Sequence, residues 1–273
     1  MRTLITLGML LASAGAHSGV AIEVERFNED GERDSVVSIQ VQDGKLRMDQ
    51  IDEEDQRSAS IYDGRRIIEA NISERTYALI ERDRLEAARK TSDPKRWLRE
   101  QLLAEVPAQR RGDSIRMMSA PPRLPRQAGH ITSEPTARVS HYAGIQCRVH
   151  RVIIDRQLRY EYCMASDSAA APLKTFVDTG REMTNLLHEF FGLLGMPTMQ
   201  DAMELFWTHV YDIEGVPLAL REFEDGALVS ESRIRSIESK DIDAHAFDIP
   251  AKLRRRAVLD FSAPASGLPS SDE

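Results

Sequence analysis

Two short patterns contain residues that could carry out catalysis, and both are incomplete. Gly112-Asp113-Ser114 has the order of one serine-esterase nucleophile block, but no Asp-x-x-His follows near the C-terminus to supply the base that a serine nucleophile needs. His188-Glu189 begins like the helical zinc-protease motif, but Gly192 stands where the second histidine belongs. The sequence has no phosphate loop, dinucleotide fingerprint or G-x-S-x-G elbow. We therefore expect no enzyme activity, metal or cofactor, and keep an unrecognised hydrolase as a third hypothesis.

The two cysteines, Cys147 and Cys163, are the next residues with chemical potential. Residues 145–154 and 158–164 are predicted to be strands joined by a turn near 155–157, and in that register the cysteines face each other. A metal pair or a redox pair is the alternative, but the spacing is not C-x-x-C and no second pair completes a tetrahedral site. In an exported chain we expect a structural disulfide, which would stabilise the fold by roughly 3 kcal/mol.

The first 21 residues have the order of a cleavable secretory signal. Arg2 supplies a positive start, residues 4–11 form a short apolar run, and small residues follow, with candidate cleavage sites after Ala14, Ala16 and Ala21. The apolar run is too short to span a bilayer, which takes about 20 residues. A core helix at the N-terminus is the alternative. We predict a signal peptide over 1–21 and a periplasmic or secreted protein.

Composition limits the remaining possibilities. The 273 residues are 41% hydrophobic and 29% charged, which is typical of a globular protein. The sequence has no second long apolar stretch, so we predict no transmembrane span. The formal net charge of -8 argues against nucleic acid as a partner, because phosphate binding needs a basic surface. We expect one domain over 22–256 and a disordered tail over 257–273, which is rich in Ser, Pro and Ala.

Residues 22–80 have the pattern of an antiparallel meander. Apolar and polar residues alternate over 37–42, the period of a half-buried strand, and Asp43-Gly44 then gives a strong hairpin signal. Leu46 and Met48 share one face of the return strand, and Asp63-Gly64 gives a second hairpin signal of the same kind. Short strands at regular spacing predict a curved sheet or barrel.

A basic, proline-rich insertion interrupts this pattern at about 84–140. Asp93-Pro94 favours a helix start, with the helix ending near Val106, and a polar stretch with several prolines follows. Residues 84–126 contain 11 basic and 5 acidic residues. The insertion is either a solvated loop or a docking segment for anionic headgroups or an acidic partner.

After the cysteine hairpin, the sequence predicts helices and then more strands. Apolar residues recur at helical spacing over 176–194, with Gly195 at the expected C-terminal cap. Residues 198–201 resemble a capping box that opens a second, shorter helix, and strands are expected over 208–213, 216–223 and 227–237.

Methionines cluster with aromatic residues in these helices, a composition over-used on adaptable apolar binding surfaces. The cluster either belongs to the core between helix and sheet or forms a deformable lid over an apolar pocket. Its members are Met183, Phe190, Phe191, Met196, Met199, Met203, Phe206 and Trp207.

Four short motifs resemble those of an exported bacterial family of unknown function whose fold is similar to the lipoprotein carriers LolA and LolB. They are residues 41–49 (VQDGKLRMD), 144–147 (GIQC) with a strand ending at 162–163 (YC), 215–218 (GVPL) and 247–250 (FDIP). The resemblance implies a mainly β, α+β fold, with a curved antiparallel sheet or incomplete barrel and amphipathic helices on its concave face. It brings over no catalytic residue.

These expectations lead to two main functional hypotheses. The first is a binding or chaperone-type protein that holds a lipid, a lipidated protein or another amphiphile in an apolar cavity. The second is an envelope sensing or assembly protein that binds another protein through the basic insertion. For the first hypothesis, the predicted ligand-binding residues are Ile39, Val41, Leu46, Met48, Phe176, Met183, Leu187, Phe190 and Phe191.

Overall fold

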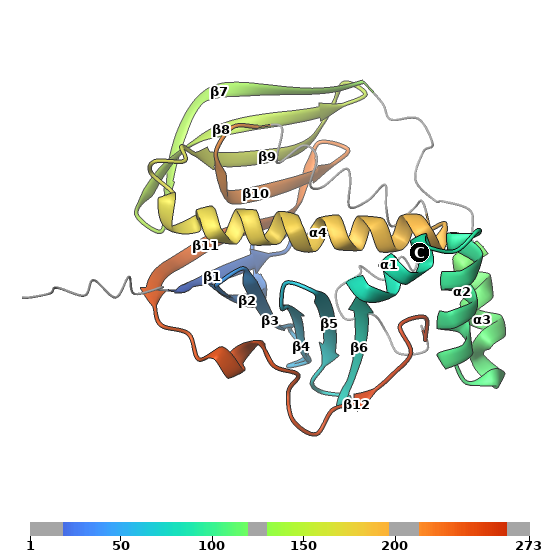
Figure 1. The fold of residues 1–273 in the computed structure, drawn as a ribbon. Helices are drawn as coiled ribbons and strands as arrows, with labels where there is room; N and C mark the ends of the chain where they lie inside the picture. Colours follow the sequence, from blue (N-terminus) through green and yellow to red (C-terminus); the bar gives the residue numbers. More distant parts are fainter. Residues whose placement is uncertain (1–18, 120–129, 197–212, 261–273) are drawn as a thin grey trace, which may run out of the picture.

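The computed structural model describes residues 19–119, 130–196 and 213–260, and within them the chain forms one sheet and four α-helices (Figure 1). The strands are β1 Gly19–Phe27, β2 Arg33–Gln42, β3 Lys45–Ile51, β4 Arg57–Tyr62, β5 Arg66–Asn71, β6 Thr76–Glu81, β7 Ile131–Tyr142, β8 Ile145–Ile154, β9 Gln157–Ala165, β10 Val216–Glu224, β11 Ala227–Lys240 and β12 Arg254–Arg255. The α-helices are α1 Arg82–Arg89, α2 Pro94–Glu105, α3 Arg111–Ser119 and α4 Lys174–Leu194, and the short 3-10 helices are η1 Ala108–Arg110, η2 Ala171–Leu173 and η3 Ala244–Phe247.

The twelve strands form a single open sheet in the order β12-β6-β5-β4-β3-β2-β1-β11-β10-β9-β8-β7. All neighbours are antiparallel except β12 and β6, which are parallel. Strands β1 to β6 lie on one side of α4 in Figure 1 and β7 to β10 lie on the other. The curved sheet therefore wraps around the helix. This is the predicted fold class, a curved antiparallel sheet with helices packed on it.

Helix α4 and the helix-facing side of the sheet form the main core. Phe190 and Leu194 are buried on α4, and Ile39, Val41 and Leu46 are buried on β2 and β3 in the same apolar cluster. The alternation of apolar and polar residues on β2 and β3 places one side of each strand against the helix. Gly195 ends α4 in the left-handed conformation with φ 71°, where a side chain would be strained, which confirms the predicted cap.

The opposite side of β4 to β6 is covered by the segment after β11. Ile242 and Phe247 pack there on Ile61, Ile68 and Leu79. Because both sides of these strands are buried at this end, consecutive residues are buried there, Ile61 and Tyr62 on β4 and Ile67 and Ile68 on β5, instead of a clean alternation.

Helix α2 and the hairpin turns follow their sequence signals. The Asp93 side chain accepts a hydrogen bond from the Arg96 N–H, as a helix cap should. Asp43 and Gly44 both have positive φ, 51° and 70°, as a tight two-residue hairpin turn requires. The strands over 216–223 and 227–237 are confirmed as β10 and β11.

Three expectations need correction or lie outside the described residues. The insertion is mostly helical up to residue 119 and ends in strand β7, because apolar residues such as Leu98 and Leu102 give its helices a buried side. The predicted disordered tail begins too early, since Leu259 is buried in the main core and Asp260 is also buried. The predicted signal up to residue 18, the second helix and most of the strand over 208–213 lie outside the described residues.

The disulfide between Cys147 and Cys163 is confirmed, but its register differs from the prediction. The Cα atoms of the two cysteines are 5.3 Å apart. Strand pairing places Cys163 opposite Val149, so the cysteines are not directly opposed. The difference arises because β8 and β9 shift register between Val152 and Ile153 and turn through only two residues, Asp155 and Arg156.

Candidate ligand-binding cavity

A cavity of about 440 Å³ lies between the first turn of α4 and the side of β1, β10 and β11 that faces this helix. Phe176 comes from α4, and the sheet supplies most of the remaining wall. The volume lies within the range of about 300–1,000 Å³ that is usual for small-molecule sites. The lining residues are Ile22, Val24, Arg26, Tyr162, Phe176, Pro217, Leu218, Ala219, Leu220, Glu222, Ser230, Ser232, Arg233 and Ile234.

The residues that line the cavity change from apolar to polar along the strands, as the strand pairing shows. Val24 pairs with Ile234, and this part of the cavity is apolar. One step along the same side, Arg26 pairs with Ser232, and Ser232 pairs with Leu220. The next step pairs Ser230 with Glu222. The cavity therefore has an apolar end and a polar end.

The polar end contains two basic side chains, Arg26 and Arg233, and one acidic side chain, Glu222. The Arg26 guanidinium lies 3.5 Å from the Asp34 carboxylate, and its side chain is 45% exposed. Glu222 accepts a hydrogen bond of 2.7 Å from the buried hydroxyl of Ser230. Arg233 also borders the cavity, but its guanidinium lies over the Phe27 ring, 4.1 Å from the centroid.

Tyr162 stands where the apolar and polar ends meet. It pairs with Leu220, and its side chain is 1% exposed. Among the described residues, its hydroxyl has no hydrogen-bond partner. Burial, and then the neighbouring Tyr160 and Glu222, raise the pKa of Tyr162, so the phenol keeps its proton. A buried donor without an acceptor destabilises the fold.

The predicted ligand-binding residues lie together in the core, but only Phe176 lines this cavity. Ile39, Val41, Leu46, Met183 and Phe190 are buried in the main core cluster. Met48, Leu187, Phe176 and Phe191 are partly buried and pack against that cluster. The predicted role of the other eight in ligand binding stays a prediction.

Sequence reasoning missed β1, β10 and β11 as the cavity walls. The sequence contains little information about this cavity. Val24 and Ile234 fit the alternation of a strand, but no nearby residue indicates that these distant segments are neighbours. The polar residues at Arg26, Ser232 and Glu222 look like ordinary solvent-facing positions. Only the pairing of β1 with β11 and β11 with β10 brings them to one place.

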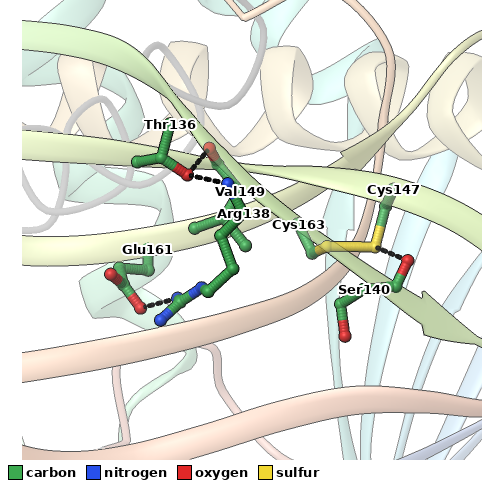
Figure 2. The surroundings of a disulfide bond; sticks show 7 residues. All are labelled: Thr136, Arg138, Ser140, Cys147, Val149, Glu161 and Cys163. Carbon is green, nitrogen blue, oxygen red and sulfur yellow. Dashed lines mark hydrogen bonds and ion pairs between the residues drawn. A yellow bond between two sulfur atoms is a disulfide. The ribbon is translucent and has the colours of Figure 1, made fainter.

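A second, smaller cavity of about 150 Å³ lies near the disulfide and is rich in charge. Three guanidinium groups surround the Glu161 carboxylate, whose side chain is 5% exposed: Arg138 bonds to it, Arg151 lies at 3.3 Å and Arg221 at 4.0 Å. A register shift in β7 between Pro135 and Val139 aims Arg138 across β8 toward Glu161, as Figure 2 shows. These contacts fasten the edge strand β7 to β9.

The basic residues of the insertion make many contacts inside the protein. Arg84 pairs with Glu105, Arg89 with Glu189, and Arg110 with the buried Asp260. Two further guanidinium groups, those of Arg99 and Arg111, donate to backbone carbonyls. Much of the local basic excess therefore serves the fold.

The incomplete catalytic patterns have structural explanations. Ser114 is 2% exposed and donates a hydrogen bond of 2.6 Å to the Leu259 carbonyl, which ties α3 to the segment after β12.

In the described part of the chain, no three His, Cys, Asp or Glu side chains gather to form a metal site. None of the described helices is long and apolar enough to cross a membrane.

Comparisons with known proteins found no matching family model and no matching curated protein. Among solved structures, an uncharacterized conserved protein from Thermus thermophilus is similar over 88% of this chain and 90% of its own, at 3% identity and a TM-score of 0.41.

Two further solved structures are similar to the chain. The complex of MucA and MucB from Pseudomonas aeruginosa matches over 89% of this chain and 60% of that chain, at 13% identity and a TM-score of 0.36. A LolA superfamily protein from Nitrosomonas europaea matches over 85% of this chain and 90% of its own, at 8% identity and a TM-score of 0.24. The chain also matches a structure of MucB, of whose length it covers 61%, less than two thirds.

Proposed function

We propose that this protein is an exported binding or chaperone-type protein that holds the apolar part of a lipid, a lipidated protein or another amphiphile. The observation that carries the proposal is the cavity under Phe176, which has an apolar body and one polar end. This is the shape that an amphiphile requires. The disulfide between Cys147 and Cys163 fits an oxidising compartment, such as the periplasm.

The energetics of chain burial are sufficient for useful binding. Burial of each methylene supplies about 0.8 kcal/mol, so several methylenes in contact with Val24, Leu218 and Ile234 offset the cost of ordering the ligand. These three side chains come from three neighbouring strands, so the wall is fixed by backbone hydrogen bonds before any ligand arrives. A preformed wall lowers the ordering cost of binding.

A partner protein docked on the basic insertion is the competing hypothesis. The internal contacts of Arg84, Arg89 and Arg110 weigh against it, because these guanidinium groups already have carboxylate partners. We therefore place the ligand site in the cavity.

The test fills the cavity with a side chain. Ser232 lies on its wall between Arg26 and Leu220, so Ser232→Trp places an indole where the ligand would lie. We expect at least about tenfold weaker binding of a fluorescent undecanoic acid, because the apolar area available to the probe is lost. Circular dichroism and the unfolding midpoint report whether the fold is retained.

Ser236→Trp is the matched control. Ser236 is on the same strand and pairs with Glu23, but it does not line the cavity. This variant should bind the probe like the unmodified protein. Equal binding by Ser232→Trp and the unmodified protein would place the site elsewhere, and no binding by the unmodified protein would refute the proposed function.

A further inference from the structure

The walls of the cavity become more buried from its polar end to its apolar end. At the polar end the Arg26 side chain is 45% exposed, so this end opens to solvent. At the apolar end Ile22 on β1 is 2% exposed, and Leu218 on β10 is also buried. The wall on β1 ends at Ile22, because Val20, the next residue on the same side of that strand, does not line the cavity. A chain that enters from the polar end would therefore stop against Ile22.

Packed side chains close the apolar end on both sides of Ile22. In the strand pairing, Ile22 lies opposite Ile39 on β2 and opposite Ile237 on β11. Neither of these residues lines the cavity. Ile39 is buried in the main core cluster, and Ile237 packs against that cluster. The cavity thus ends at a wall that strand pairing holds in place.

The volume of the cavity limits how much of a ligand can be buried in it. An apolar cavity of about 150 Å³ holds one benzene molecule, which is a ring of six carbon atoms. At the same density, the cavity of about 440 Å³ under Phe176 holds roughly 18 carbon atoms. One acyl chain of about 12 carbons is within this limit, whereas two such chains exceed it.

The length of the wall on β1 gives a second, independent estimate. Ile22 and Arg26 are four residues apart on this strand, which is about 13 Å at about 3.3 Å per residue. An extended peptide advances about 3.4 Å over three backbone bonds, so an extended hydrocarbon chain advances roughly 1.2 Å per bond. A chain that reaches from Arg26 to Ile22 therefore has about 11 carbons. The volume has room for one chain of this length and not for two.

We propose that the cavity takes a single acyl chain and that Ile22 sets the length of chain that can be buried, an inference that rests on the proposed function. The chain lies between Phe176 and the sheet, with its terminal methyl against Ile22 and its head group at the solvent-exposed polar end. A chain of about 11 to 18 carbons fills the cavity. A second chain of similar length stays in water and adds nothing to the affinity.

The first test is a chain-length series on the full mature protein. Saturated fatty acids from octanoic to eicosanoic acid compete with the fluorescent undecanoic acid, and each is delivered from cyclodextrin so that it stays monomeric. Affinity should rise by up to about fourfold for each added methylene. It should stop rising between about 11 and 18 carbons, where the chain has reached Ile22. Affinity that keeps rising through eicosanoic acid would overturn the length limit.

Ile22→Ala tests the residue that sets the limit. The substitution removes every side-chain carbon beyond Cβ at the apolar end, so the length limit should increase by about three carbons. Ile39→Ala is the matched control, because Ile39 lies opposite Ile22 and is buried in the same cluster but does not line the cavity. The control should lose stability in urea as Ile22→Ala does and keep the length limit of the unmodified protein. A limit that moves equally in both variants, or in neither, contradicts the role of Ile22.

A milder pair of variants keeps the inference testable if Ile22→Ala does not fold. Ile22→Val removes a single carbon from the same wall. It should bind the first fatty acid beyond the limit up to about fourfold more tightly than the unmodified protein does. Ile39→Val is the control and should bind this fatty acid unchanged. Equal binding by Ile22→Val and Ile39→Val would again contradict the role of Ile22.

The second test counts the chains that the cavity buries. The probes 1-lauroyl-lysophosphatidylcholine and dilauroyl-phosphatidylcholine have the same head group and the same chain length, and they differ in the number of chains. At equal concentrations of free monomer, the two-chain lipid should bind no more tightly than the one-chain lipid. Binding of the two-chain lipid that is tighter by about tenfold or more would show that both chains are buried, since each added methylene in the cavity contributes up to about fourfold.

The outcomes separate this inference from the proposed function. No binding of any probe by the unmodified protein overturns both. Binding without a length limit, or much tighter binding of the two-chain lipid, overturns the single chain and leaves a protein that binds amphiphiles.

Discussion

Glu69 gives a quantitative prediction about the pH dependence of stability. It lies on β5, partly buried, and accepts a hydrogen bond of 2.7 Å from the Ser60 hydroxyl on β4. Burial raises the pKa of Glu69 from 4.5 to about 7, because removal from water disfavours the carboxylate. The Ser60 hydroxyl and the charge of Arg256 act in the opposite direction and are too weak to restore the usual pKa.

The sign of the effect follows from proton binding in the two states. Below pH 4.5 the carboxyl is protonated in both the folded and the unfolded protein. Between pH 4.5 and about 7 the unfolded chain loses this proton while the folded protein keeps it, so stability falls as pH rises. At about 1.4 kcal/mol per pKa unit, the full loss is on the order of 3 kcal/mol, an upper bound because partial exposure of the side chain screens the charge.

Glu69→Gln removes the titration and keeps an oxygen that can accept from Ser60. We expect the variant to match the unmodified protein near pH 4.5 and to exceed its free energy of unfolding by up to about 3 kcal/mol at pH 8. Urea unfolding at a series of pH values measures the difference, with Glu74→Gln, at an exposed turn, as the control. A difference between Glu69→Gln and the unmodified protein that does not change with pH would refute the reasoning.

Two further predictions concern the disulfide and the start of β1. Replacing both cysteines with alanine should lower the free energy of unfolding by about 3 kcal/mol, the chain-entropy value for a bridge with a sequence separation of 16, and an unchanged urea midpoint would contradict it. Gly19, Val20 and Ala21 pair with β2 or β11, so we expect export processing to leave them in place, with cleavage after Ala16 or Ala14; an intact mass that begins at Ile22 would contradict this.

The main elements could be predicted because their signals are local. The period of the apolar residues over 176–194 and the cap at Gly195 depend only on the chain near α4, and Asp43-Gly44 fixes a hairpin by its own backbone preferences. Strand register is harder to predict. A shift between Val152 and Ile153 moved the cysteines out of direct opposition, and no residue type marks that shift in the sequence.

The cavity could not be predicted because its walls come together only through long-range pairing. Arg26 and Ser232 are far apart in sequence and adjacent in the sheet. The helix residues chosen from periodicity identify a buried side, but periodicity does not separate side chains that fill the core from those that border a cavity. Phe176 borders the cavity, whereas Phe190, with the same apolar character, is buried in the core.

The motifs that resemble an exported family act on the architecture of the sheet. Arg47 bonds to Asp49 on its own strand and donates a hydrogen bond of 2.8 Å to the Ala246 carbonyl, while the Lys45 ammonium lies 6.0 Å from the centre of the Phe247 ring. The motif on β3 therefore holds the segment that contains the motif at 247–250. Leu46 and Met48 alternate with these basic residues and face the main core.

These two motifs do not line the cavity under Phe176, whereas Pro217 and Leu218 of the motif at 215–218 and Tyr162 of the motif end at 162–163 do. The likeness at residues 41–49 and 247–250 therefore indicates how the sheet is held together. Arg26 and Glu222, at the polar end of the cavity, belong to none of the motifs, so proteins that share the motifs can still differ at that end.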